Sequence, residues 1–105
     1  MKKLQILGSR VSVKVKKIDD SLGLAGFYNP ETKEIVIDPR FSKLGLTYLH
    51  EVFHSIWDRS GLNQTDVDRN IQEILCETFS TAIGENLVTI VQTFNKLDKL
   101  DKLKK

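Results

Sequence analysis

The two histidines of this 105-residue chain lie four positions apart, in the segment TYLHEVFHSIW (residues 47–57). On a helix, His50 and His54 would face the same side, one turn apart, where two imidazoles can bind one metal ion. Glu51 would lie beside that ion, where its carboxylate can take a proton from a coordinated water. The segment therefore predicts a zinc site with Glu51 as the general base.

The residues around the motif have the period of a helix over about residues 43–60. At about 100° per residue, the apolar side chains between Leu49 and Ile56 fall on one side of this helix, and both histidines fall on the other. The alternative is a pair of ordinary surface histidines with no shared ligand. A third ligand elsewhere in the chain argues against that alternative.

A catalytic zinc ion needs three protein ligands and one open position. The chain has no third histidine, and its single cysteine, Cys76, falls nearer the apolar side of the next predicted helix, so the third ligand should be a carboxylate. Glu73 is the candidate ligand. Glu77, one turn later on the same face, could accept the outer N–H of a liganding histidine. The alternative for these two glutamates is a solvated acidic stripe.

The motif HEVFH, followed by eighteen residues and a glutamate, resembles the gluzincin pattern of zinc metallopeptidases. The wider arrangement, GFYNPETKEIVIDP, LTYLHEVFHSIWDRSGL and EILCETFSTAI, is similar to small phage and bacterial metallopeptidases of the ImmA/IrrE-like group. This resemblance implies a hydrolase that cleaves protein or peptide substrates. It implies one zinc ion bound by His50, His54 and Glu73, with Glu51 as base and Glu77 supporting a histidine.

The first forty residues have the shorter period of β-strands. The segment RVSVKVKKI (10–18) alternates apolar and polar residues, and LAGFYNPETKEIVIDP (24–39) has the pattern of two strands around a turn. We therefore expect an α+β, minimal zincin-like fold. Its small antiparallel sheet, over about residues 3–38, would pack on the motif helix.

The second helix should carry the remaining ligand. We expect it over about residues 66–83, and it could continue to residue 98 if Gly84 does not break it. Residues 1–95 would form a single domain. Residues 96–105 would form a lysine-rich tail, either helical or disordered, which accounts for the net charge of +2.

The strand predicted at 34–38 directly precedes the motif helix and ends at Pro39, as an edge strand can. By the resemblance, such a strand lies along the cleft and pairs with an extended substrate. Ile35, Val36 and Ile37 are therefore candidate substrate-binding residues. The alternative is a hairpin strand that is paired on both sides.

Peptide hydrolysis also needs a hydrogen-bond donor for the tetrahedral intermediate. Tyr28 and Tyr48 are the candidate transition-state stabilisers. Three arginines, Arg40, Arg59 and Arg69, or a backbone N–H could do the same, and the sequence leaves these alternatives open.

Composition limits the other possible functions. The excess lysines lie in the tail, so we expect no nucleic-acid partner, and no run approaches the roughly 18 apolar residues of a membrane span. One cysteine fits a reducing compartment, and we expect a cytoplasmic protein, in the host cytoplasm if a phage encodes it. The oligomeric state is left open. The alternative function is a non-catalytic, zinc-stabilised protein-interaction module.

Overall fold

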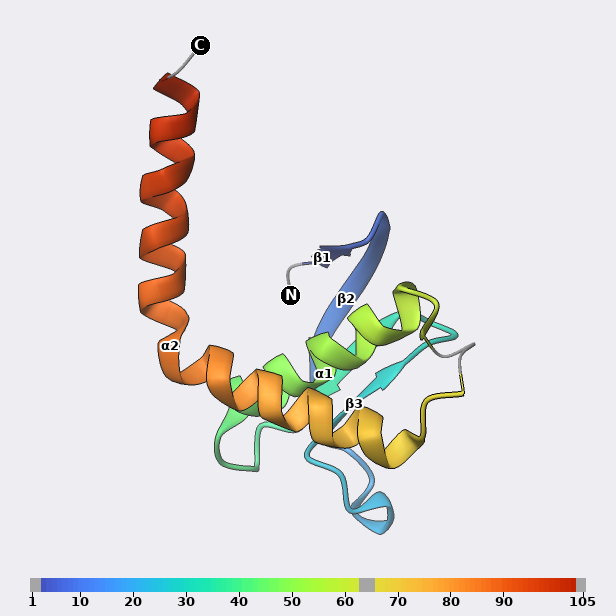
Figure 1. Ribbon diagram of the computed structural model, residues 1–105. Helices are drawn as coiled ribbons and strands as arrows, with labels where there is room; N and C mark the ends of the chain where they lie inside the picture. Colours follow the sequence, from blue (N-terminus) through green and yellow to red (C-terminus); the bar gives the residue numbers. More distant parts are fainter. Residues whose placement is uncertain (1–2, 63–65, 104–105) are drawn as a thin grey trace.

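Two long helices and one four-stranded sheet make up the part of the chain that this computed structural model describes, residues 3–62 and 66–103 (Figure 1). This arrangement confirms the α+β class. In chain order the elements are β1 (Lys3–Ile6), β2 (Ser9–Val15), the short 3-10 helix η1 (Asp20–Leu22), β3 (Gly26–Asn29), β4 (Glu34–Ile37), α1 (Leu44–Arg59) and α2 (Arg69–Leu103).

The sheet is mixed, so the prediction of a purely antiparallel sheet is wrong. Its strand order is β1-β2-β4-β3, with β1–β2 and β3–β4 antiparallel and β2–β4 parallel. The connection over residues 16–25 crosses from β2 to β3 and leaves the position between these two strands open. β4, the next strand in the chain, occupies that position. Alternating hydrophobicity identifies the two faces of a strand but not its neighbours, so the sequence could not reveal this order.

The predicted substrate strand is at the centre of the sheet. β4 pairs with β2 on one side and with β3 on the other, and Ile35, Val36 and Ile37 are all buried. The expectation that these residues offer a free edge to a substrate is therefore wrong. Pro39 directly follows β4, but it does not indicate an edge strand here, because β4 is paired on both sides.

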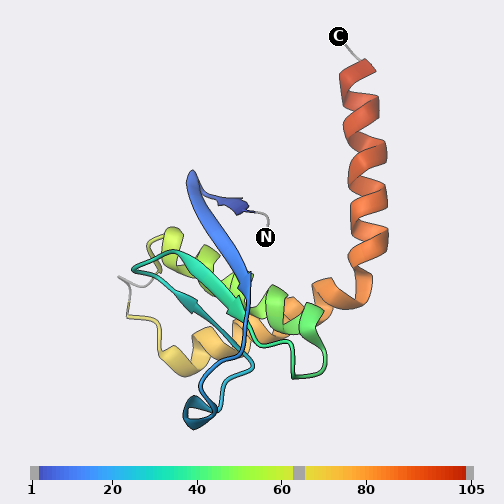
Figure 2. The ribbon, with the colours of Figure 1, turned by 180° about the vertical axis from the view of Figure 1, so that it is seen from behind.

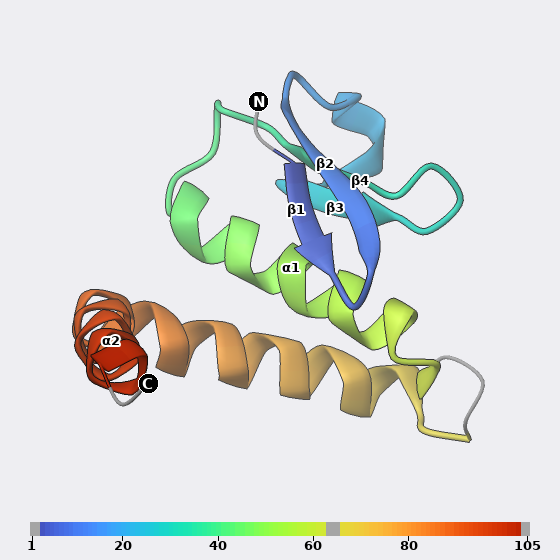
Figure 3. The same cartoon turned by 90° about the horizontal axis from the view of Figure 1, so that it is seen from above.

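The molecule is layered, with α1 between the sheet and the first half of α2 (Figure 3). The buried core lies between the sheet and α1. It consists of Ile6, Val11, Val13, Ile35 and Ile37, with Leu4, Tyr28, Tyr48 and Val52 packed against it. The sheet thereby fixes one side of the motif helix, and α2 contacts the other.

α2 runs without interruption from Arg69 to Leu103, so the second helix continues past Gly84, as in the longer of its two predicted extents, and ends beyond residue 98. The Asp68 side chain accepts the backbone N–H of Asn70 at 2.6 Å, which satisfies a free donor at the helix start. Gly84 does not end the helix, which bends partway along and leaves the body of the molecule (Figure 1). Residues 96–103, which belong to the predicted tail, form the last turns of α2 and are therefore helical.

A seam of small residues allows α2 to pack closely on α1. Cys76, Ser80 and Gly84 recur every four positions and so share one face of α2, and Ser55 of α1 is fully buried. At Gly84, an added Cβ would lie 2.6 Å from Cδ2 of Leu46 on α1. The glycine therefore makes room for the other helix.

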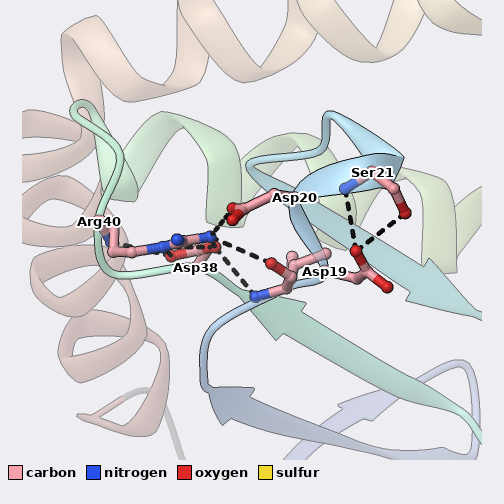
Figure 4. Close-up of polar contacts among 6 residues, drawn as sticks. Asp19, Asp20, Ser21, Asp38 and Arg40 are labelled. Atoms are coloured by element: carbon pink, nitrogen blue, oxygen red, sulfur yellow. Dashed lines mark hydrogen bonds and ion pairs between the residues drawn. The ribbon is translucent and has the colours of Figure 1, made fainter.

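A buried carboxylate ties the β2–β3 connection to the segment that follows β4 (Figure 4). Asp38 is fully buried and accepts the backbone N–H of Ile18 at 3.0 Å and the Nη2 of Arg40 at 2.7 Å. The Arg40 guanidinium also pairs with Asp20 at 2.9 Å. Hydrogen bonds from Arg40 and from the two backbone amides hold the pKa of Asp38 well below its usual value, despite its burial.

Gly84→Leu should force the two helices apart, because the new side chain would occupy the space of Leu46. We expect the free energy of unfolding, measured by urea titration, to fall by about 1–3 kcal/mol. Gly45→Ala on α1 is the matched control, since a Cβ there meets nothing within 4 Å. A Gly84→Leu variant as stable as the wild type would contradict this close packing.

Asp38→Asn should lower the melting temperature at neutral pH by several degrees, because Arg40 loses its buried charge partner. The folded pKa of Asp38 lies below its unfolded value of about 3.9, so its stabilisation is complete above that pH and is lost as pH falls further. The two proteins should therefore converge in stability in acid. Asp20→Asn, at an exposed carboxylate, should change little. A constant difference from pH 7 to pH 2 would contradict the assignment.

Candidate metal centre

Three side chains with metal-ligand chemistry meet where α1 faces the first half of α2. His50 and His54 project from one face of α1, and their Nε2 atoms are 3.0 Å apart. Glu73 projects from α2, with its Oε1 3.0 Å from His54 Nε2 and its Oε2 3.3 Å from His50 Nε2. The structure thus brings together the three ligands that the sequence predicted.

The spacing of these atoms fits a single metal ion. Ligands about 2.0–2.1 Å from a tetrahedral ion are about 3.3 Å from one another. The two Nε2 atoms are 3.0 Å apart, and each is 3.0–3.3 Å from a different oxygen of Glu73. One donor atom from each of the three residues lies within 4.8 Å of the other two, so His50, His54 and Glu73 could hold a metal ion.

Glu77 lies behind His50, on the side away from the three donor atoms. Its Oε2 is 3.0 Å from His50 Nδ1. A carboxylate accepts but does not donate, so this contact places the proton of a neutral His50 on Nδ1 and leaves the Nε2 lone pair free. This is the contact that the sequence predicted for Glu77.

Gln72 lies behind His54, and nothing in the sequence pattern predicted this contact. Its amide nitrogen, Nε2, is 2.9 Å from His54 Nδ1 and can only donate, so in this orientation Nδ1 is the acceptor and a neutral ring carries its proton on Nε2. A half-turn of the amide would present its oxygen, which accepts an Nδ1–H and leaves Nε2 free. A glutamine in the first turns of a helix is too ordinary to be singled out without the position of His54.

The two histidines and Glu51 lie in different electrostatic surroundings. Burial lowers the pKa of His54, so its ring favours the neutral form that binds metals. Glu51 is buried to 8% exposure, and this burial raises its pKa to about 7, with a further increase from the charge of Glu73. His50 and a hydrogen bond from the Tyr28 backbone act in the opposite direction.

A cavity of about 400 Å³ opens beside these residues. Its walls come from β3, α1 and the first turns of α2, and they include Glu51, His54, Glu73 and Arg69. The three ligands and the predicted base therefore reach a space large enough for a few residues of a ligand.

Of the two tyrosines predicted as transition-state stabilisers, only Tyr28 lines this cavity. Tyr28 lines it and donates its hydroxyl to Asp58 at 3.0 Å, and burial together with this bond raises the pKa of Tyr28 to about 12. Tyr48 faces the core and a separate apolar cavity beside β1 and β2. Arg40 is held by Asp38 (Figure 4) and is not among the residues that line the cavity.

Cys76 is close to the centre but lies on its outer side. Its Sγ is 3.8 Å from His54 Nδ1, the nitrogen that faces away from the other donor atoms. Burial raises the pKa of the thiol to about 11, which keeps it neutral at physiological pH. In this arrangement Cys76 packs in the seam between the helices and is not one of the three ligands.

Comparison of the chain with models of protein families, with curated proteins and with solved structures gives no match. The interpretation of the centre therefore depends on its own geometry. That geometry consists of three converging donor atoms, one contact behind each histidine, and a buried glutamate at a cavity.

Proposed function

We propose that the chain is a zinc-dependent metallopeptidase in which Glu51 acts as the general base. The observation that carries this proposal is the convergence of His50, His54 and Glu73 beside a buried carboxylate at an open cavity. Structural zinc sites are closed by a fourth protein ligand, whereas catalytic sites keep one position open. Three candidate ligands next to an open cavity therefore support a catalytic zinc site.

Zinc suits this set of ligands better than the other common divalent ions. Two imidazoles and one carboxylate are a usual ligand set for zinc, while magnesium and calcium prefer six or more oxygen ligands. A bound zinc ion would supply a Lewis acid that polarises the scissile carbonyl and lowers the pKa of a water molecule toward neutrality. Glu77 would keep His50 in the tautomer that binds it, and Gln72 would do the same for His54 once its amide oxygen faced Nδ1.

Glu51 is suited to moving a proton at this position. Its pKa of about 7 lies near neutral pH, and a nearby cation would lower it and favour the ionised form that accepts a proton. Its carboxylate is held by the Tyr28 backbone and lies at the cavity wall. It would accept the proton of the attacking water and then give it to the leaving amine.

The substrate would be a protein or peptide segment in an extended conformation, lying along β3. Among the described strands, β3 has a single neighbour, β4, and residues of β3 line the cavity. An extended segment can add to such an edge through backbone hydrogen bonds, with little sequence preference. Of the side chains predicted to stabilise the tetrahedral intermediate, Tyr28 and Arg69 line the cavity, and a backbone N–H is the alternative.

Alanine substitutions of His50, His54 and Glu73 should each reduce zinc from one ion per chain to a small fraction of that, measured by mass spectrometry of metals after dialysis. Glu77→Gln should weaken zinc binding about 10- to 100-fold and no more, because it orients a ligand without being one. Zinc should also raise the melting temperature of the wild type, since it binds only the folded chain.

Glu85→Gln provides the matched control, because Glu85 is an exposed residue of the same helix. It should bind zinc like the wild type. Full zinc content in Glu73→Ala would show that the third ligand is another group.

Glu51→Gln should keep its zinc and lose at least 10²-fold in the hydrolysis of an unfolded protein substrate, because the amide cannot accept the proton. Glu31→Gln, in the exposed turn after β3, is the control and should be fully active. Unchanged hydrolysis in Glu51→Gln would contradict the role of the base. A zinc-loaded wild type that cleaves no unfolded protein would instead favour a non-catalytic zinc module.

A further inference from the structure

The C-terminal half of α2 stands away from the rest of the molecule. Residues 87–103, called here the projecting helix, leave the body beyond the bend of α2 and extend into solvent (Figure 1 and Figure 2). The body packs against the earlier part of α2, up to Gly84 and its contact with Leu46. Isolated helices of this length are marginal in water, so a packing partner would be expected to stabilise it.

The projecting helix carries an uncovered apolar stripe. Leu87, Ile90, Phe94 and Leu97 follow one another at spacings of three, four and three residues, which places them on one face. They are 42%, 41%, 66% and 59% exposed. Val91 and Leu100, also exposed, flank the stripe. A continuous apolar face of this kind on a free helix marks an interaction surface.

A membrane-spanning role does not fit this helix, although α2 as a whole has the length and composition to cross a bilayer. Its first half carries Glu73 and Glu77 at the metal centre and so belongs to the folded body. Beyond Gly84, only residues 86–95 form a run without charge. That run is about 15 Å long, roughly half of the hydrocarbon thickness.

We propose that the projecting helices of two copies of this chain pair in an antiparallel orientation to form a homodimer. The spacing of the stripe is that of the seam positions in a two-helix coiled coil. In the antiparallel pairing that matches these positions, Leu87 faces Leu97 of the second copy and Ile90 faces Phe94. The stripe is thus complementary to itself, as a twofold interface requires.

Charge selects the antiparallel orientation. Asp98 and Asp101 fall within about 40° of Phe94 around the helix, so both lie on the side of the stripe. In a parallel pair, each aspartate would lie next to the same aspartate of the second copy, and the two negative charges would repel each other. The antiparallel pairing would separate the two copies of Asp101 by roughly 27 Å along the axis. These aspartates also disfavour burial of the stripe in lipid.

The area of the stripe is sufficient for a reversible dimer. The exposed parts of the four stripe side chains and of the flanking Val91 and Leu100 amount to on the order of 500 Å² per chain. Two copies would therefore bury on the order of 1,000 Å², the size of a weak, reversible interface. The cavity lies at the opposite end of α2, near Arg69, and would stay open in the dimer. This proposal does not depend on the proposed peptidase function.

Sedimentation velocity on the full chain, over a range from about 1 to 200 µM, tests the dimer. We expect a shift from monomer to dimer across this range, and Phe94→Asp should raise the dissociation constant at least 30-fold. Gln92→Asp, on the opposite face of the same helix, is the matched control and should dimerise like the wild type. A second control, Val15→Lys in the apolar cavity beside β1 and β2, should also leave the dimer intact.

Cysteine cross-linking tests the orientation. Leu87→Cys mixed with Leu97→Cys should form a disulfide-linked dimer under mild oxidation, whereas each variant alone should not, because its two copies would be about 15 Å apart. Self-linking of either variant would show a parallel pair. The buried Cys76 should not react, and the unsubstituted chain checks this.

A wild type that remains monomeric at 200 µM would overturn the proposal. Binding of this monomer to anionic phospholipid vesicles, lost in Phe94→Asp, would then assign the stripe to a membrane surface. Loss of the dimer in Val15→Lys, with Phe94→Asp still dimeric, would place the interface on the sheet side and would also overturn it.

Discussion

The close contact between α1 and α2 is the constraint on which the rest of the structure depends. The two histidines belong to one helix and the carboxylate to the other, so the distance between the helices sets the distance between the donor atoms. Cys76, Ser80 and Gly84 keep this distance short by presenting little side chain to α1. Bulkier residues there would separate Glu73 from the histidines, so the seam positions the metal centre as directly as the ligands do.

The electrostatics of the centre favour a bound cation. Glu51, Glu73 and Glu77 gather around two imidazoles, and Arg69 is the only cationic side chain among the described residues that line the cavity. Carboxylates this close repel one another, and part of the raised pKa of Glu51 comes from Glu73. A divalent ion at the three donor atoms would offset this repulsion.

The sequence predicted the ligand group well because helical periodicity fixes which residues share a face. His50 and His54 on one helix, and Glu73 and Glu77 on another, follow directly from spacings of four residues. The neighbours of a strand do not follow from its alternation, so the sequence could not decide between an edge position for β4 and the pairing on both sides that the structure shows, and it did not indicate the edge position of β3. Gly84 suggested a helix break, whereas its role is to admit Leu46, which only the packing of two distant segments reveals.

X-ray absorption at the zinc edge, on protein loaded with one equivalent of zinc, tests the metal centre most directly. The structure predicts a first shell of nitrogen and oxygen at about 2.0–2.1 Å, with the outer-shell scattering of two imidazole rings, and this signal should lose one ring in His54→Ala. A sulfur scatterer at about 2.3 Å would show that Cys76 binds the metal and the helices pack differently. A shell without imidazole would contradict the centre altogether.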